Sequence, residues 1–103
     1  MQIDEQTDGS TATLLLSGRL TVNDSPGRLK DAASRLATGG ATLVVFDLAD
    51  VRYVDSACLG EFIAAQISLG RRGARLQLAR VPARIMELLR LSGLDGIFDI
   101  SIP

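Results

Sequence analysis

Apolar residues recur along the chain at two alternating spacings. Short runs of consecutive or alternating apolar residues are typical of strands, and apolar residues repeated at i, i+3, i+4 and i+7 are typical of helices that bury one face. The short runs predict strands over residues 2–6, 11–17, 42–48, 74–79 and 97–102. The helical repeats predict helices over residues 26–38, 55–69 and 82–92.

The order of these elements, β-β-α-β-α-β-α-β, predicts the fold class. Strands that alternate with helices form right-handed crossovers and therefore a mostly parallel sheet. The pair Asp8-Gly9 is typical of a hairpin turn and adds one antiparallel strand at the N-terminus. Residues 42–48 are almost continuously apolar, as in a parallel strand covered on both faces. With no linker or repeat, the chain predicts a single α/β domain over residues 1–103 with a mostly parallel sheet of four to five strands.

Individual residues mark the ends and faces of the predicted helices. Ser25 before Pro26 is typical of an N-cap followed by the first helical residue. Asp31 and Arg35 lie four positions apart on the side predicted to face solvent, where they can form an ion pair. The predicted apolar stripes are Leu29, Ala32, Ala33 and Leu36 in the first helix, Leu59, Phe62, Ile63 and Ile67 in the second, and Ile85, Met86, Leu88 and Leu89 in the third.

Composition narrows the class of protein. The chain is 47% hydrophobic, 22% charged and carries a net charge of −1, which gives no sign of nucleic-acid binding. No apolar stretch approaches the roughly 20 residues of a membrane span, and the N-terminus does not resemble a signal peptide. The single cysteine, Cys58, cannot form an intramolecular disulfide and suits a reducing compartment. We therefore expect a soluble cytoplasmic protein with no nucleic-acid and no membrane partner.

Positive charge is concentrated between positions 71 and 90. Two interpretations are open: a solvated face, or a surface that binds an acidic protein partner. The six arginines of this region are Arg71, Arg72, Arg75, Arg80, Arg84 and Arg90.

The chain contains no histidine, which excludes several kinds of site at once. Ser-His and Cys-His catalytic pairs cannot form, and with a single cysteine a structural zinc site has almost no ligands. Neither a GxGxxG nor a GxxxxGK[ST] motif is present, so dinucleotide and P-loop nucleotide sites have no support. We expect no catalytic residue, no metal ligand and no cofactor.

Ser56 lies after the predicted strand of residues 42–48, at the start of a predicted helix, and a serine there can act as a nucleophile, a helix cap or a phosphoacceptor. A nucleophile needs a base, but the only lysine, Lys30, is predicted on the solvent side of the first helix, and the adjacent Asp55 would activate a serine poorly. Asp55 and Ser56 are both favoured caps, so one can cap while the other serves a function. A phosphate on Ser56 would meet free amides at the positive end of the helix. The residues alone leave cap and phosphoacceptor open.

Several motifs in register resemble those of STAS domains, the family typified by bacterial anti-sigma factor antagonists. In that family an apolar strand is followed by an Asp-Ser-(Ser/Thr/Ala)-Gly-(Leu/Ile)-Gly segment that opens a helix, and here Asp55-Ser56-Ala57 and Leu59-Gly60 occupy the corresponding positions. Gly-x-Leu, Gly-x-x-Leu and Leu-x-Leu-Ser-Gly-Leu elements also match, at residues 18–20, 73–76 and 89–94. The resemblance covers most of residues 12–100.

The resemblance implies a partner switch. The unphosphorylated antagonist would bind an anti-sigma factor that is a serine kinase, phosphorylation at Ser56 would release it, and a serine/threonine phosphatase would reset it. The antagonist itself would have no catalytic activity and would regulate sigma-factor-dependent transcription. The residues that the resemblance implies for partner binding are Asn23, Asp24, Asp55, Ser56, Ala57, Cys58, Leu59 and Glu61.

Two departures from the family pattern alter these expectations. Cys58 occupies a position where the family usually has glycine, so a side chain there is expected to crowd the kinase or change the helix start. The sequence ends at Pro103, whereas family members commonly continue into another helix, which leads us to expect an exposed apolar strip and a homodimer. The alternative function is a non-switching STAS docking subunit of an ABC-type lipid transport complex.

Overall fold

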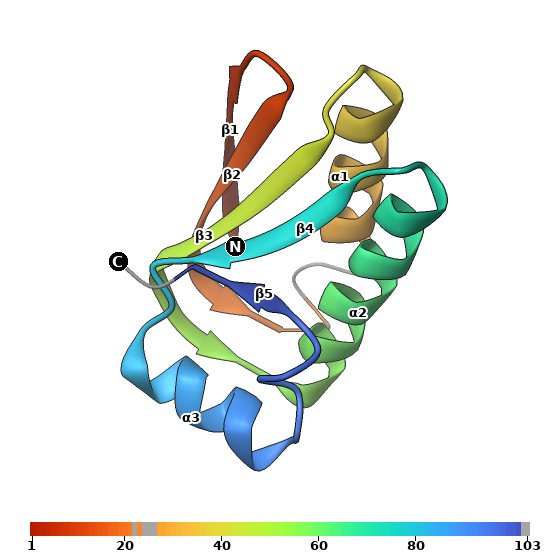
Figure 1. Ribbon diagram of the computed structural model, residues 1–103. Helices are drawn as coiled ribbons and strands as arrows, with labels where there is room; N and C mark the ends of the chain where they lie inside the picture. Colours follow the sequence, from red (N-terminus) through yellow and green to blue (C-terminus); the bar gives the residue numbers. More distant parts are fainter. Residues whose placement is uncertain (22, 24–26, 102–103) are drawn as a thin grey trace.

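The computed structural model describes residues 1–21, 23 and 27–101, which form one sheet and three helices (Figure 1). The predicted element order is confirmed. The elements are β1 (Gln2–Asp8), β2 (Thr11–Leu20), α1 (Arg28–Thr38), β3 (Leu43–Val54), α2 (Ser56–Arg71), β4 (Arg75–Ala79), α3 (Ala83–Leu91) and β5 (Asp99–Ile100).

The sheet has five strands in the order β1-β2-β3-β4-β5. β1 pairs with β2 antiparallel, and every other neighbouring pair is parallel, as the sequence predicts. α1 and α2 lie side by side against one face of the sheet, and α3 lies apart from them near the carboxyl end of β3 (Figure 1). Residues on both faces of β3 are buried, Phe46 on one and Val45 on the other, which confirms the doubly covered strand.

Aromatic contacts hold the middle of an otherwise aliphatic core. Phe62 of α2 packs edge-on against Phe46 of β3, with ring centroids 5.5 Å apart, and against Phe98 before β5, at 6.3 Å. Edge-to-face geometry is favoured because the positive ring edge meets the negative ring face. The three rings therefore join the central strand, the helix that begins at Ser56 and the C-terminal segment.

The buried face of α2 differs from the predicted stripe. Ile67 is 51% exposed, whereas Phe62, Ala65 and Leu69 are buried. With 3.6 residues per turn, Ile67 lies about 140° around the helix from Phe62. The sequence prediction was wrong here because it followed the large apolar side chains and ignored Ala65, whose small side chain faces the core.

Several boundaries also differ from those predicted. β3 continues to Val54 because its C-terminal half pairs with the end of β2, after shifts of register. The final strand is only two residues long, and Ile102 lies outside the described residues. Ser25 and Pro26 also lie outside them, and α1 begins at Arg28. The predicted pair of Asp31 with Arg35 is replaced by an ion pair between Arg35 and Glu5 of β1.

Candidate functional site

The start of α2 is defined by a hydrogen bond from Asp55. The Asp55 carboxylate accepts from the backbone N–H of Cys58 at 2.8 Å, the geometry of an N-cap. The Asp55 N–H donates to the Leu20 carbonyl at 3.1 Å, which ties the β3–α2 junction to the end of β2. Asp55 therefore ends the strand, begins the helix and fixes both to the sheet.

Ser56 is the first residue of α2, and its side chain is exposed. Because Asp55 supplies the cap, the Ser56 hydroxyl is not needed to hold the helix. Within the described part of the chain it makes no side-chain hydrogen bond. The structure thus assigns the cap to Asp55, and Ser56 presents a hydroxyl to solvent.

Two electrostatic features surround Ser56. The start of α2 stabilises an added anion, and the Asp55 carboxylate places a negative charge beside it. The positive end of the α2 dipole lies at this position and stabilises negative charge by roughly 0.3–1 kcal/mol at exposed sites. The adjacent Asp55 carboxylate already carries one negative charge on the same surface. An anion on Ser56 would therefore leave the helix intact while making this surface strongly acidic.

Glu61 is directed inward. Its Oε1 accepts from the backbone N–H of Leu29 at 2.8 Å, and its Oε2 lies 3.9 Å from Sγ of Cys58. The residue before α1 is Gly27, with φ 76°, which has no side chain to cap the helix. Glu61 supplies that cap from α2, so it positions the start of α1. The glycine at the N-cap position is the feature of the sequence that could have indicated this contact. Because glycine has no side chain to accept from the first amides of the helix, a residue elsewhere in the chain must do so.

The remaining residues predicted to bind a partner fall into three groups: exposed, buried, and outside the described residues. Ala57 and Asn23 are exposed, and Asp24 lies outside the described residues. Cys58 is 1% exposed and Leu59 is 3% exposed, so both belong to the core. The expectation that the Cys58 side chain crowds an approaching kinase is therefore revised: its side chain packs inside the first turn of α2. We leave Cys58 and Leu59 out of the contact surface.

An apolar groove that the sequence analysis did not predict lies beside Ser56. Its volume is about 390 Å³, and we call it the Ser56 groove. Leu91 is 79% exposed and Tyr53 is 42% exposed, and the Arg19 guanidinium lies 4.7 Å from the centre of the Tyr53 ring. The groove is lined by Tyr53, Val54, Asp55 and Ser56 at the β3–α2 junction and by Arg84, Ile85, Glu87, Leu88 and Leu91 of α3. Leu91 does not belong to the apolar stripe of α3. Its place outside the stripe is the feature of the sequence that could have indicated an exposed leucine here.

The arginines of residues 71–90 do not form one patch. Arg80 binds the buried Asp47 carboxylate through Nε at 2.9 Å and through a terminal nitrogen at 2.7 Å, and these contacts raise the pKa of Arg80. Arg84 donates to the Arg52 carbonyl at 3.0 Å, and Arg90 pairs with Glu87. Three of the six arginine side chains therefore make contacts within the described part of the chain.

Replacing Asp55 with alanine should lower the free energy of unfolding by about 0.5–2 kcal/mol, because α2 loses its cap. Ser56→Ala should change it by less than about 0.5 kcal/mol, since an exposed hydroxyl without a partner is removed. Asp55→Asn is the matched control, because its amide oxygen can still accept from Cys58. Urea denaturation of the three variants measures these values. A larger loss for Ser56→Ala than for Asp55→Ala would contradict the assignment of the cap.

The described residues were also compared with what a metal site and a membrane-spanning helix require. They contain no group of three acidic or cysteine side chains that could hold a metal ion. None of the helices in the described ranges is long and apolar enough to span a membrane. The groups around Ser56 are its own hydroxyl, the carboxylates of Asp55 and Glu87, the Arg84 guanidinium and the apolar side chains of the groove.

Comparisons with known proteins give matches over nearly the whole chain. A family profile described as "Mlab, STAS domain" matches residues 3–100. The anti-sigma-B factor antagonist of Bacillus subtilis (strain 168) is 30% identical over 101 residues, which cover 98% of this chain and 91% of that protein.

Solved structures share the fold. An anti-sigma factor antagonist from Mycobacterium paratuberculosis superposes with a TM-score of 0.83 at 19% identity, over 99% of this chain and 86% of that one. The anti-sigma factor antagonist SpoIIAA matches in its unphosphorylated form with a TM-score of 0.78, over 98% of this chain and 89% of that one, and in its phosphorylated form with a TM-score of 0.73, over 98% and 92%, both at 16% identity. The chain belongs to the STAS domain family, and its relatives include anti-sigma factor antagonists, which are regulatory proteins and not enzymes.

Proposed function

We propose that this protein is an anti-sigma factor antagonist that works as a phosphorylation switch at Ser56. In its unphosphorylated form it binds an anti-sigma factor that is a serine kinase, and phosphorylation of Ser56 releases it. A serine/threonine phosphatase restores the binding form. The proposed location is the cytoplasm, where sigma factors act on transcription.

The observation that carries this proposal is that Asp55, and not Ser56, caps α2. Asp55 caps α2 through the Cys58 amide, and the exposed Ser56 hydroxyl has no structural duty. A kinase can therefore modify Ser56 without removing a contact on which the fold depends. A serine that capped the helix would lose that contact on modification.

The Ser56 groove explains how one phosphate could change affinity. The apolar side chains of Tyr53, Leu88 and Leu91 offer a docked partner area to bury next to Ser56. A phosphate adds about −1.5 to −2 charges at pH 7, directly beside the Asp55 carboxylate. Bringing a partner onto this surface would then require desolvating two adjacent anions, which weakens an interface that depends on apolar contact.

Other parts of the predicted interface stay predictions. Asn23 and Asp24, in the segment before α1, are proposed contacts because Glu61 holds the start of α1 against α2. A homodimer also stays a prediction.

The alternative is a non-switching STAS subunit that docks on an ABC-type lipid transport complex. Both functions use a docking surface, but only the switch needs a free hydroxyl on it. The exposed Ser56 beside the Ser56 groove favours the switch. Binding to an ATPase subunit that is equally tight for the native chain and for Ser56→Asp would favour the alternative.

Incubation with the anti-sigma factor kinase of the same organism and ATP should add one phosphate, detected by intact-protein mass spectrometry. Ser56→Ala should remain unmodified, and Ser92→Ala, which removes another exposed serine, should be modified like the native chain. The phosphorylated protein should separate from the kinase in size-exclusion chromatography. Phosphate at another residue, or a complex that survives modification, would refute the switch.

Replacing Leu91 with serine should weaken binding of the unphosphorylated protein to the kinase by about tenfold or more, because a leucine side chain loses its buried contacts. Ile97→Ser is the matched control, since Ile97 is also an exposed aliphatic residue but lies outside the Ser56 groove. Isothermal titration calorimetry measures both affinities. Equal losses for the two variants would show that α3 is not part of the interface.

A further inference from the structure

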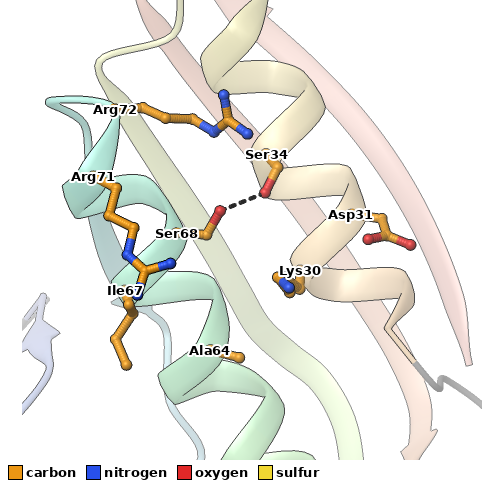
Figure 2. A pocket seen from close by; sticks show the side chains of 8 residues that line it. All are labelled: Lys30, Asp31, Ser34, Ala64, Ile67, Ser68, Arg71 and Arg72. Atoms are coloured by element: carbon orange, nitrogen blue, oxygen red, sulfur yellow. Dashed lines mark hydrogen bonds between the residues drawn. The ribbon is translucent and has the colours of Figure 1, made fainter.

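A second hollow lies between α1 and α2, away from the Ser56 groove (Figure 2). Its volume is about 640 Å³, and we call it the α1–α2 hollow. Ser56 begins α2, whereas the α2 residues of the hollow lie in its last two turns, about 12–22 Å along the helix axis at 1.5 Å per residue. The hollow is lined by Lys30, Asp31 and Ser34 of α1 and by Ala64, Ile67, Ser68, Arg71 and Arg72 at the end of α2.

The α1–α2 hollow carries excess positive charge. Lys30, Arg71 and Arg72 surround it with a single carboxylate, Asp31. Figure 2 shows Arg72 reaching from α2 toward α1 and Asp31 turned away from α2. Among the described residues, none of the three cations makes an ion pair or a side-chain hydrogen bond. They differ in this from the paired arginines elsewhere in the chain, and their charge is available to a ligand.

The wall of the hollow adds a hydrogen-bond donor. The hydroxyls of Ser34 and Ser68 lie 2.7 Å apart across the helix interface and share one hydrogen bond. Each hydroxyl has one proton, so a pair that shares a single bond keeps a second proton to donate. Within the described ranges no acceptor takes that proton. The hollow thus combines three cations with one free O–H donor.

The edge of the hollow is aliphatic. Ile67 is 51% exposed and stands next to the half-buried Ala64 on α2. A small anion would use the cations and the hydroxyl but would gain nothing from Ile67. A peptide that carries carboxylates beside an aliphatic side chain would use all of them, because carboxylates pair with arginine and lysine while the aliphatic group covers Ile67.

We propose that the α1–α2 hollow is a second docking site, and that it binds an acidic segment of a protein partner in which an aliphatic residue lies among carboxylates. The site is separate from the Ser56 groove, so its occupant can remain bound whether or not Ser56 is phosphorylated. The protein would then hold one partner constantly while it exchanges another at Ser56. The proposal goes beyond the switch and does not require it.

The test uses a fluorescein-labelled synthetic peptide in which leucines recur at helical spacing among glutamates, with binding followed by fluorescence anisotropy at low ionic strength. Binding should saturate and should weaken as salt is added, because the contacts include exposed charges. Ser56→Asp should bind the peptide as tightly as the native chain. A loss of binding in Ser56→Asp would place the peptide at the Ser56 groove and overturn the proposal without touching the switch.

Two sets of variants test the assigned contacts. Arg71→Gln combined with Arg72→Gln should weaken binding about five- to tenfold, from two exposed charge pairs. The charge-matched control combines Arg52→Gln with Arg90→Gln, both exposed and outside the hollow, and should leave the affinity unchanged. Ile67→Ser should weaken binding about three- to fivefold through the lost apolar contact. Equal losses in the two double variants would mean unspecific charge attraction and would overturn the site.

Two further results distinguish other occupants. Inorganic phosphate should displace the peptide no better than sodium chloride of equal ionic strength; specific displacement, together with unchanged binding in Ile67→Ser, would identify a small-anion site instead. The protein alone should sediment identically with and without the Arg71→Gln and Arg72→Gln changes. Self-association that these changes abolish would identify a second copy as the occupant and overturn the acidic partner.

Discussion

The hydrogen bond from the Cys58 amide to the Asp55 carboxylate determines which side chain at the start of α2 is needed for the fold. A helix start must satisfy amides that have no partner within the helix, and a side chain just before it usually does so. Because Asp55 performs this function here, the next residue is released from it. We therefore propose that Ser56 can be modified without a cost to the helix.

The junction that holds Asp55 is itself tied to three other parts of the molecule. The Asp55 N–H binds the carbonyl of Leu20 at the end of β2, Phe62 anchors the next turn of α2 in the core, and Glu61 caps α1 through the Leu29 amide. These contacts join the inner side of the surface around Ser56 to β2, to α1 and to the core. The outer side presents the Ser56 hydroxyl, the charged side chains of Asp55, Arg84 and Glu87 and the apolar side chains of α3, which suits a surface that recognises a partner.

Local patterns predicted most of the fold but only part of the site. The element order and the parallel sheet follow from alternating strand and helix periods, which depend on neighbouring residues. The contacts that build the site join residues far apart in the sequence. Glu61 caps α1 through an amide 32 positions away, and α3 supplies Leu91 to the Ser56 groove. Ile67 shows the same limit: the apolar period suggested that Ile67 is buried, yet the packing of α2 leaves it 51% exposed. Burial of this kind depends on how α1, α2 and the sheet meet, which no single stretch of sequence contains.

We propose that phosphorylation at Ser56 changes the surface and leaves the fold in place, since Asp55 keeps the cap. Amide hydrogen exchange measured by NMR on the unphosphorylated and phosphorylated protein tests it most directly. We predict that the Cys58 amide stays protected in both forms and that shift changes are confined to the β3–α2 junction and the facing side of α3. Loss of protection at Cys58, with shift changes spreading along α2 and into the sheet, would contradict this account.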